Sequence, residues 1–244
     1  MHDLGQTRSA NRCDHLLLTP DAFVRAPLPC IERGTAIVLV SPANGAAFTQ
    51  YIAELEAGGT LTSTPSQRFV SILSGSVDLV TDSSFRPLTA GEFAYLPQGL
   101  SHTLTAHRAT RLAVVEKPYE SLDGFVAPGL ITGSEAAVAS SALMDDVDVQ
   151  VRMLLPDQPA FDFAFNTMTY QPGASLSRVE IHVMEHGLLM MEGGGIYRLG
   201  DAWYSVTAGD FIWMAPFCPQ WFGALGKSPA KYLIYKNCNR HPIG

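Results

Sequence analysis

The sequence is poor in charged residues and has no long apolar run. Charged side chains make up 16% of the 244 residues and hydrophobic side chains 47%, which indicates a packed globular protein and not a disordered chain. No apolar run reaches the roughly 18 residues that a membrane helix needs. The first twenty residues carry charges and lack an apolar run of the signal-peptide type, so we expect a cytoplasmic protein.

Positive charge and paired cysteines are also scarce. The chain has 16 Lys and Arg against 23 Asp and Glu, a net charge of −7, which argues against nucleic acid or an anionic membrane as partner. We therefore expect a small molecule as the substrate or ligand. The cysteines show no CxxC spacing, which favours free thiols in a reducing compartment. They are Cys13, Cys30, Cys218 and Cys238.

Segments with a helical period are few, and short β-rich runs bounded by Gly, Pro or Ser take their place. This pattern predicts an all-β sandwich or barrel. The runs cover residues 36–40, 69–73, 77–80, 93–96 and 111–115, and the pattern resumes at 147–154 and 161–170. Residues 118–145 are rich in Gly, Pro, Ala and Ser, which predicts a linker with at most one short helix. Residues 1–20 are expected to form a poorly ordered or docking arm.

The second half of the chain repeats the first. Gly193 follows an apolar run 118 residues after Gly75, and the Thr-Ala-Gly-Asp-Phe segment around Gly209 lies 118 residues after Thr-Ala-Gly-Glu-Phe around Gly91. A common offset with matching residue types indicates a duplicated domain. The predicted organisation is an N-terminal domain with the arm over residues 1–117 and a C-terminal domain over 146–244. The strand edges and apolar content of two small barrels favour packing together and homo-oligomers.

A cluster of potential metal ligands lies in the second copy. Glu180 and His182 are two residues apart, so on a strand they point to one face, and His186 can join them after a bend or on a continued strand. Carboxylate and imidazole bind Mn, Fe, Co, Ni or Zn. Gln220 stands where the repeat predicts a further ligand. It could instead orient the other ligands without contacting the metal itself. Each residue alone is better explained as core or surface, but the set favours a metal. Glu185 is out of step and is expected on a solvated face.

The first copy lacks equivalent ligands. The positions 118 residues before the three ligands hold Thr62, Thr64 and Arg68, and Arg68 would repel a cation. The remaining His102, which corresponds to Gln220, is expected to be a hydrogen-bonded structural residue. The first half then serves stability and assembly, and the protein is expected to bind one metal per chain.

Lys236 is one of only four lysines, and it ends an apolar run that predicts a strand over residues 232–236. Tyr232, Ile234 and Lys236 would share one face. If that face lines the barrel, Lys236 points at the metal, where cation and burial favour its neutral form and suit it to proton transfer. It could instead bind a substrate carboxylate, or be a strand-end lysine that reaches solvent.

The repeated unit resembles the cupin superfamily. Gly91, five residues, Pro97-Gln98-Gly99, two residues and His102 resemble the second cupin motif, although Ala106 stands where an Asn is common. The stretch from Glu180 to His186, followed after six residues by Gly193, resembles the first motif. Glycines at the turns and a strand leading to a ligand at the barrel mouth fit this architecture. The resemblance covers residues 30–117 and 146–240, a tandem of two jelly-roll-like cupin barrels.

The ligand set departs from the common cupin pattern and is similar to that of the (S)-ureidoglycine aminohydrolase family, bicupin enzymes of allantoin breakdown. Further matching segments are 17–21, 144–147 and 235–240. The resemblance implies hydrolytic release of ammonia, and Mn²⁺ bound by Glu180, His182, His186 and Gln220. It also supports Tyr197 and Tyr232 as substrate hydrogen-bond donors. Together with the position of Lys236, we expect proton transfer by Lys236 and substrate contacts from Glu180, Tyr197, Tyr232 and Lys236. A metal-dependent bicupin oxygenase with Fe and a non-enzymatic ligand-binding cupin remain as alternatives.

Overall fold

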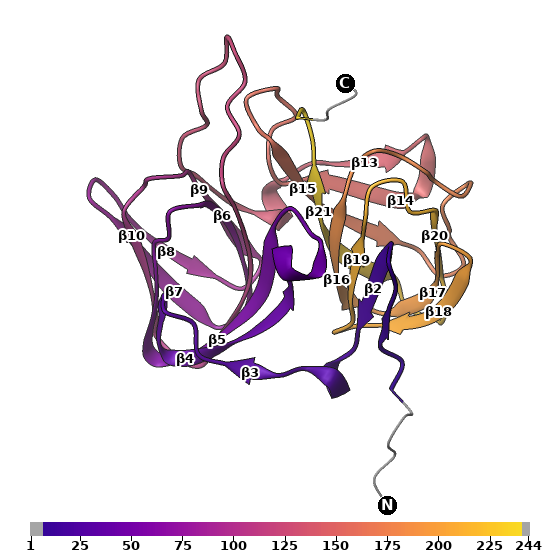
Figure 1. The fold of residues 1–244 in the computed structure, drawn as a ribbon, viewed down its shortest axis with the longest axis horizontal. Coiled ribbons are helices and arrows are strands. Elements are labelled where there is room, and N and C mark those ends of the chain that lie inside the picture. Colours follow the sequence, from indigo (N-terminus) through magenta and orange to yellow (C-terminus); the bar gives the residue numbers. More distant parts are fainter. Residues whose placement is uncertain (1–6, 241–244) are drawn as a thin grey trace, which may run out of the picture. The chain divides into compact units, whose positions relative to one another are not determined.

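The computed structural model describes residues 7–240, and in it the chain folds into two all-β units (Figure 1). The N-terminal barrel comprises Val24–Val138. The C-terminal barrel combines the arm up to Phe23 with the chain from Ala139 onward. The helical structure within residues 7–240 consists of three short 3-10 turns: η1 (Pro20–Ala22), η2 (Pro42–Asn44) and η3 (Glu135–Ala137). None of them has the length and apolar character that a membrane crossing requires.

The N-terminal barrel is built from one curled, antiparallel ten-stranded sheet. Eight strands follow one another in the order β12 (Ile131–Ser134), β9 (Glu92–Leu96), β6 (Gln67–Ser74), β11 (Thr110–Lys117), β5 (Thr49–Thr62), β10 (His102–Ala106), β7 (Ser76–Thr81) and β8 (Phe85–Thr89). The other two are β4 (Ile31–Val40), which also pairs with β5, and β3 (Arg25–Ala26), which pairs with β4. The five strands predicted in this half are all present.

Alternation of side chains builds the interior of this barrel. In β10 every second side chain, from His102 through Leu104 to Ala106, is buried, while Thr103 and Thr105 are partly exposed. This is the period of two that places alternate residues on opposite faces of a sheet. Between β6 and β7, Gly75 has a positive φ of 87°, and an added Cβ would lie 2.2 Å from the Thr110 hydroxyl. The tight turn at this point therefore requires glycine.

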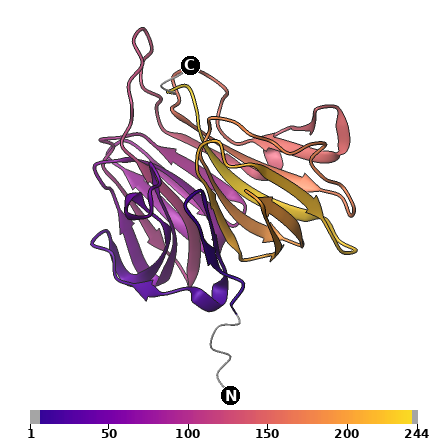
Figure 2. The same ribbon diagram turned by 45° about the vertical axis from the view of Figure 1, so that its right-hand side comes forward.

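The C-terminal barrel contains an eight-stranded and a three-stranded sheet (Figures 1 and 2). The larger sheet runs in the order β1 (Ala10–Asn11), β2 (His15–Leu18), β19 (Phe211–Met214), β16 (His186–Glu192), β21 (Ala230–Asn237), β15 (Phe163–Tyr170), β14 (Asp146–Met153) and β13 (Ser140–Leu143). The smaller one runs β18 (Ala202–Thr207), β17 (Gly194–Leu199) and β20 (Gln220–Ala224). Buried apolar and tyrosine side chains from both sheets form one core.

The arm belongs to the C-terminal barrel, which differs from the predicted grouping of residues 1–117. Strand β2 pairs with β19, with Leu17 opposite Ile212 and His15 opposite Met214 (Figure 1). Leu17 is fully buried, so the apolar run of the arm docks as an additional strand. The sequence predicts a poorly ordered or docking arm here, and the structure shows that it docks on a strand almost 200 residues away. The predicted arm residues 1–6 lie outside the described part of the chain.

The predicted linker, residues 118–145, also contains paired structure. Strand β12 pairs with β9 of the N-terminal barrel, and β13 pairs with β14 of the C-terminal barrel. The predicted short helix is the 3-10 turn η3 between these two strands. The segment therefore contributes an edge strand to each barrel, because backbone pairing with an existing edge overrides its Gly- and Pro-rich composition.

Candidate metal centre

All the predicted site residues line one cavity of about 560 Å³ in the C-terminal barrel. The proposed ligands, the two tyrosines and the lysine all contribute to its wall: Glu180, His182, His186, Tyr197, Gln220, Tyr232 and Lys236. Around them lie methionine, leucine and isoleucine side chains. A cavity with an apolar wall and a few converging polar groups is typical of a small-molecule site.

The ligand stretch is not a continuous strand, and of the two predicted arrangements the structure has the one in which His186 follows a bend. Only Glu180 makes a backbone bridge, in which it and Gln220 each donate an N–H to the carbonyl of the other. Residues 181–185 are irregular, and the strand β16 begins at His186. The carbonyl of His182 accepts from the N–H of Phe217. This anchoring to the loop before β20, and not a shared strand face, aims the side chains into the cavity.

His182 lies at the centre of the converging groups. Its Nε2 is 3.2 Å from Nε2 of His186 and 2.7 Å from Nε2 of Gln220. The carboxylate of Glu180 stands further away, with Oε2 at 4.0 Å from His182 Nε2. It does not come within 4.8 Å of both imidazoles at once. Two imidazoles and the amide therefore converge in the structure as it stands. To complete the ligand set, Gln220 has to turn its Oε1, which now faces the Tyr197 hydroxyl, toward His182, and Glu180 has to rotate.

His186 is held as a neutral imidazole. It is buried, and its Nδ1 lies 3.3 Å from the backbone oxygen of Tyr235, which can only accept a hydrogen bond. Nδ1 therefore carries the proton, and Nε2 turns its lone pair toward His182. A fixed hydrogen bond on the far nitrogen is the usual support of a metal-binding histidine. Burial, and then the positive charge of Lys236, hold the pKa of His186 well below its ordinary value.

The close contacts among His182, His186 and Gln220 cannot all be hydrogen bonds with the protons that these side chains carry. His182 Nε2 cannot donate to His186 and accept from the Gln220 amide at the same time. Burial lowers the pKa of His182, which the Glu180 carboxylate opposes, so extra protonation is not favoured either. Metal–nitrogen bonds of about 2.1 Å place neighbouring ligands roughly 3 Å apart, close to the separations found. The residues present therefore fit a divalent cation with nitrogen and oxygen ligands.

Lys236 comes from β21 and lies directly opposite His186 in the sheet. Together with Tyr232 and Ile234 it lines the cavity, as the alternation along the predicted strand implies. Burial lowers the pKa of its ammonium, and the Glu180 carboxylate partly offsets that effect. A partly buried lysine beside imidazole and carboxylate groups is a candidate for proton transfer because its charged form is destabilised.

The two tyrosines are buried and have different partners. The Tyr197 hydroxyl lies 3.4 Å from Oε1 of Gln220, so it is placed to orient that amide. The Tyr232 hydroxyl lies 2.8 Å from the hydroxyl of Tyr170, which the sequence analysis did not single out. Burial raises the pKa of all three phenols, which keeps them protonated and able to donate. The only sequence signal for Tyr170 is its place at the end of an alternating strand.

Two further residues near the site were not predicted correctly from the sequence: Glu185 was expected elsewhere, and Arg178 was not considered. Glu185 was expected on a solvated face, but it is only 2% exposed and its Oε1 accepts from the Trp213 indole at 2.8 Å. Because residues 181–185 are not in a strand, the alternation of side chains along a strand does not predict on which side Glu185 lies. Arg178 lies at the exposed rim of the cavity and also escaped the sequence analysis.

The corresponding positions of the N-terminal barrel hold a closed network. His102 is buried, its Nε2 lies 2.8 Å from an Arg68 nitrogen, and its Nδ1 lies 2.8 Å from the Leu100 carbonyl oxygen. Arg68 is fully buried and donates from two nitrogens to Glu116 Oε1. Burial, and then the Arg68 charge, lower the pKa of His102 to about 4. The predicted hydrogen-bonded state of His102 is confirmed.

Comparisons with known proteins agree with this architecture. Residues 42–119 match the EutQ-like cupin domain family and residues 166–235 match the cupin domain family. The chain is 42% identical over 242 residues to the (S)-ureidoglycine aminohydrolase of Arabidopsis thaliana, covering 98% of this chain and 80% of that protein. The chain belongs to the (S)-ureidoglycine aminohydrolase family. A probable (S)-ureidoglycine aminohydrolase of Oryza sativa is 41% identical, over 98% of this chain and 78% of that protein.

Solved structures related to this family member have the same fold. Protein Ylba from E. coli superposes with a TM-score of 0.86 at 27% identity, over 98% of this chain and 97% of that one. A putative glyoxylate induced protein from Pseudomonas aeruginosa gives a TM-score of 0.90 at 26% identity, over 99% and 94% of the two chains. The expected tandem of cupin barrels is therefore confirmed.

Proposed function

We propose that this chain hydrolyses (S)-ureidoglycine to (S)-ureidoglycolate and ammonia in the breakdown of allantoin. The observation that carries the proposal is the convergence of His182, His186 and Gln220, with Glu180 beside them, in a chain of this family. In the reaction the C–N bond to the amino group breaks, a C–O bond to water forms, and ammonia leaves.

The metal would be a single Mn²⁺ held by Glu180, His182, His186 and Gln220. Two imidazoles, a carboxylate and an amide are a donor set that Mn²⁺ accepts. When bound, the cation supplies a Lewis acid that holds and polarises the carboxylate-bearing substrate. The N-terminal barrel lacks such a set because Arg68 brings its own positive charge to the corresponding position.

Lys236 is assigned to proton transfer. Its lowered pKa favours loss of a proton to the departing amino group, and the neutral amine can then take a proton from the attacking water. The net proton balance at Lys236 over one turnover is zero. The Tyr197 hydroxyl donates its one proton either to Gln220, which it orients, or to a polar group of the substrate, and the Tyr232 hydroxyl is a second donor for the substrate. The apolar side chains of the cavity limit the access of bulk water.

Self-association and a cytoplasmic location complete the proposal. Large apolar side chains remain exposed along the β13–β14 hairpin of the C-terminal barrel, among them Met144, Val147 and Met153. Such side chains on an edge hairpin support contact with a second copy. Light scattering on the purified protein tests this part, because a monomer at working concentration would contradict it.

Ammonia release decides the main proposal. Metal-free protein and protein reloaded with Mn²⁺ are given freshly generated (S)-ureidoglycine, and ammonia and dissolved oxygen are followed together. We expect metal-dependent ammonia release without oxygen consumption. Oxygen uptake matched to turnover would indicate an oxygenase instead. Tight binding of ureidoglycine without any ammonia above the spontaneous rate would indicate a ligand-binding cupin.

A further inference from the structure

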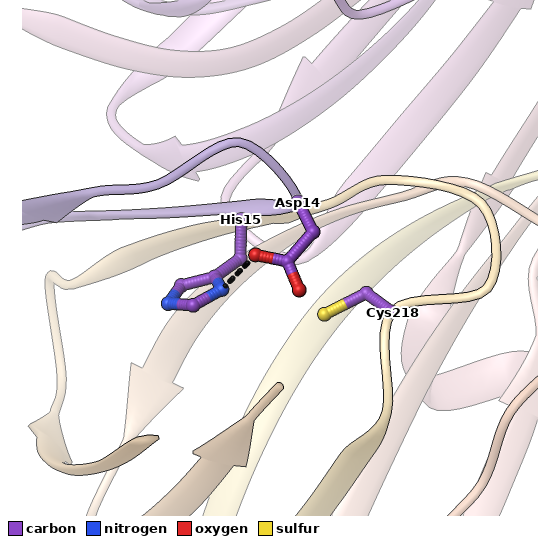
Figure 3. A group of neighbouring side chains, drawn as sticks. All are labelled: Asp14, His15 and Cys218. Atoms are coloured by element: carbon purple, nitrogen blue, oxygen red, sulfur yellow. Dashed lines mark hydrogen bonds and ion pairs between the residues drawn. The ribbon is translucent and has the colours of Figure 1, made fainter. Parts of the chain in front are cut away.

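A second group of potential metal ligands lies away from the cavity, where the arm meets the loop between β19 and β20. Asp14 and His15 come from the arm, and Cys218 comes from the loop (Figure 3). Within residues 7–240 it is the one group of three or more His, Cys, Asp or Glu residues whose ligand atoms all lie within 4.8 Å of one another. None of these residues belongs to the proposed active site.

The backbone fixes this group in place. The N–H of Ala215 donates to the carbonyl of Asp14 at 2.9 Å, and the N–H of Cys218 donates to the carbonyl of Ala215 at 3.1 Å. His15 is paired with Met214 across the two strands. The three side chains are therefore held by sheet and turn hydrogen bonds that do not depend on their own contacts, as a preorganised site requires.

The side chains point toward a common space. Asp14 Oδ1 lies 2.8 Å from His15 Nδ1, and the Cys218 sulfur faces the other oxygen of the same carboxylate (Figure 3). The far nitrogen of His15, Nε2, lies 2.8 Å from the Tyr204 hydroxyl. A metal-binding histidine commonly donates its other N–H to an outer partner, and Tyr204 is placed to accept it.

The residue types suit a thiophilic divalent cation, which on binding would displace the proton of the Cys218 thiol, whose pKa burial raises to about 11. His15 and Cys218 are buried, while the Asp14 side chain is 39% exposed and leaves a path for an ion and a water ligand. A thiolate, a carboxylate and a neutral imidazole carry two negative charges, which a divalent cation neutralises. Three protein ligands and water form a four-coordinate zinc site of mixed sulfur, nitrogen and oxygen ligands.

We propose that Asp14, His15 and Cys218 bind a second, thiophilic divalent cation such as Zn²⁺, which ties the arm to the loop that precedes Gln220. His15 binds through Nδ1 and donates its Nε2 proton to Tyr204, and Cys218 binds as the thiolate after losing its proton to solvent. The alternative is a hydrogen-bonded contact only, in which Asp14 accepts from His15 and no cation enters.

Cobalt absorption separates this site from the active site. Full-length protein loaded with Mn²⁺ is titrated with Co²⁺, and the near-ultraviolet charge-transfer band of a cobalt–thiolate bond is recorded. The proposed active site has no cysteine, so this band reports only on a thiolate site. We expect a band that saturates at about one Co²⁺ per chain, as a single site of three protein ligands requires. Absence of the band at saturating Co²⁺ would leave the hydrogen-bonded contact and overturn the proposal.

Variants identify the ligands. Cys218→Ser should abolish the band, whereas the triple variant Cys13→Ser, Cys30→Ser, Cys238→Ser should keep it, because Cys218 is then the only thiol. Asp14→Asn changes a partly exposed side chain and should weaken cobalt binding at least tenfold without unfolding the barrel. His182→Ala should keep the band although it removes a proposed Mn²⁺ ligand. A band that survives Cys218→Ser, or is lost in the triple variant, would contradict this assignment.

Zinc and thermal unfolding give a second measurement. Zn²⁺ should raise the Tm of the parent protein and leave that of Cys218→Ser unchanged, because a cation that binds only the folded state stabilises it. An equal Tm rise in both proteins would place the zinc elsewhere. Failure of this proposal does not affect the proposed ammonia release, which is measured with Mn²⁺ alone.

Discussion

The two barrels use the same pair of strands in opposite ways. In the N-terminal barrel Arg68 on β6 lies opposite Glu116 on β11, and in the C-terminal barrel His186 on β16 lies opposite Lys236 on β21. The first pair is a salt bridge at 2.6 Å around a fully buried guanidinium. The second places an imidazole and an ammonium beside a cavity of about 560 Å³.

This difference shows how a duplicated fold separates stability from chemistry. In the N-terminal barrel the cation at the ligand position is part of the chain, and its partners are His102, Glu116 and the carbonyl of Thr62. In the C-terminal barrel the two imidazoles and the Gln220 amide lack such mutual satisfaction. An imbalance of this kind favours binding of an ion or substrate from outside, whereas a complete network favours the folded state.

The largest expected effect is loss of the metal from one barrel only. Gln220→Ala and His182→Ala should reduce the manganese content from about one per chain to near none, and ammonia release to the background rate, because too few ligands remain at the cavity. His102→Ala changes the N-terminal counterpart of Gln220 and should leave the metal content unchanged. Metal analysis of the purified variants checks this. Two metals in the parent at the cupin sites, or a loss in His102→Ala, would contradict the one-barrel assignment.

Replacement of Lys236 should separate chemistry from metal binding. Lys236→Met should retain the fold and the metal but lose about 10²–10⁴-fold in kcat, the usual contribution of a general acid–base group. If the lysine only binds a carboxylate, Lys236→Arg keeps the charge and should retain most of the activity. Turnover and KM are compared at matched metal content. Parent-like turnover in Lys236→Met would remove this residue from the active site.

Breaking the ion pair of the N-terminal barrel should affect stability instead. Glu116→Gln leaves the Arg68 guanidinium without its carboxylate and should lower the free energy of unfolding by about 3 kcal/mol. Arg25→Gln breaks an exposed pair with Glu54 in the same barrel and should cost less than about 1 kcal/mol. Urea unfolding measures both. Equal stability of the two variants would show that the buried pair does not hold this barrel together.

The smallest expected effect is a dependence of the free energy of unfolding on pH that comes from His102. Gln220, at the corresponding position of the C-terminal barrel, does not titrate. The pKa of His102 falls to about 4 in the folded state, so between its ordinary value and 4 the unfolded chain binds a proton that the folded chain does not. Stability therefore decreases as the pH falls through this range, by at most about 1.4 kcal/mol per pH unit. His102→Gln, which copies Gln220, should flatten the slope of unfolding free energy against pH between pH 6 and 4. An unchanged slope would mean that another group titrates.

Much of the fold and of the candidate site can be predicted from the sequence because the signals are local. Short alternating runs predict the strands, and the offset of 118 residues predicts that Gln220 corresponds to His102. The alternation in β21 correctly brings Tyr232, Ile234 and Lys236 to one cavity. The types of the converging side chains predict metal chemistry before any distance is known.

Only the tertiary structure decides what depends on contacts between distant segments. The arm joins the C-terminal sheet because β2 covers the edge of β19, and Glu185 is buried because residues 181–185 leave the strand. The 4.0 Å gap between Glu180 and His182 also follows from the Glu180–Gln220 bridge and not from spacing. The sequence by itself determined the duplicated all-β fold and the types of ligand, since these follow from local periodicity. Edge pairing and barrel closure determined which of those side chains meet, since both join residues that no local pattern connects.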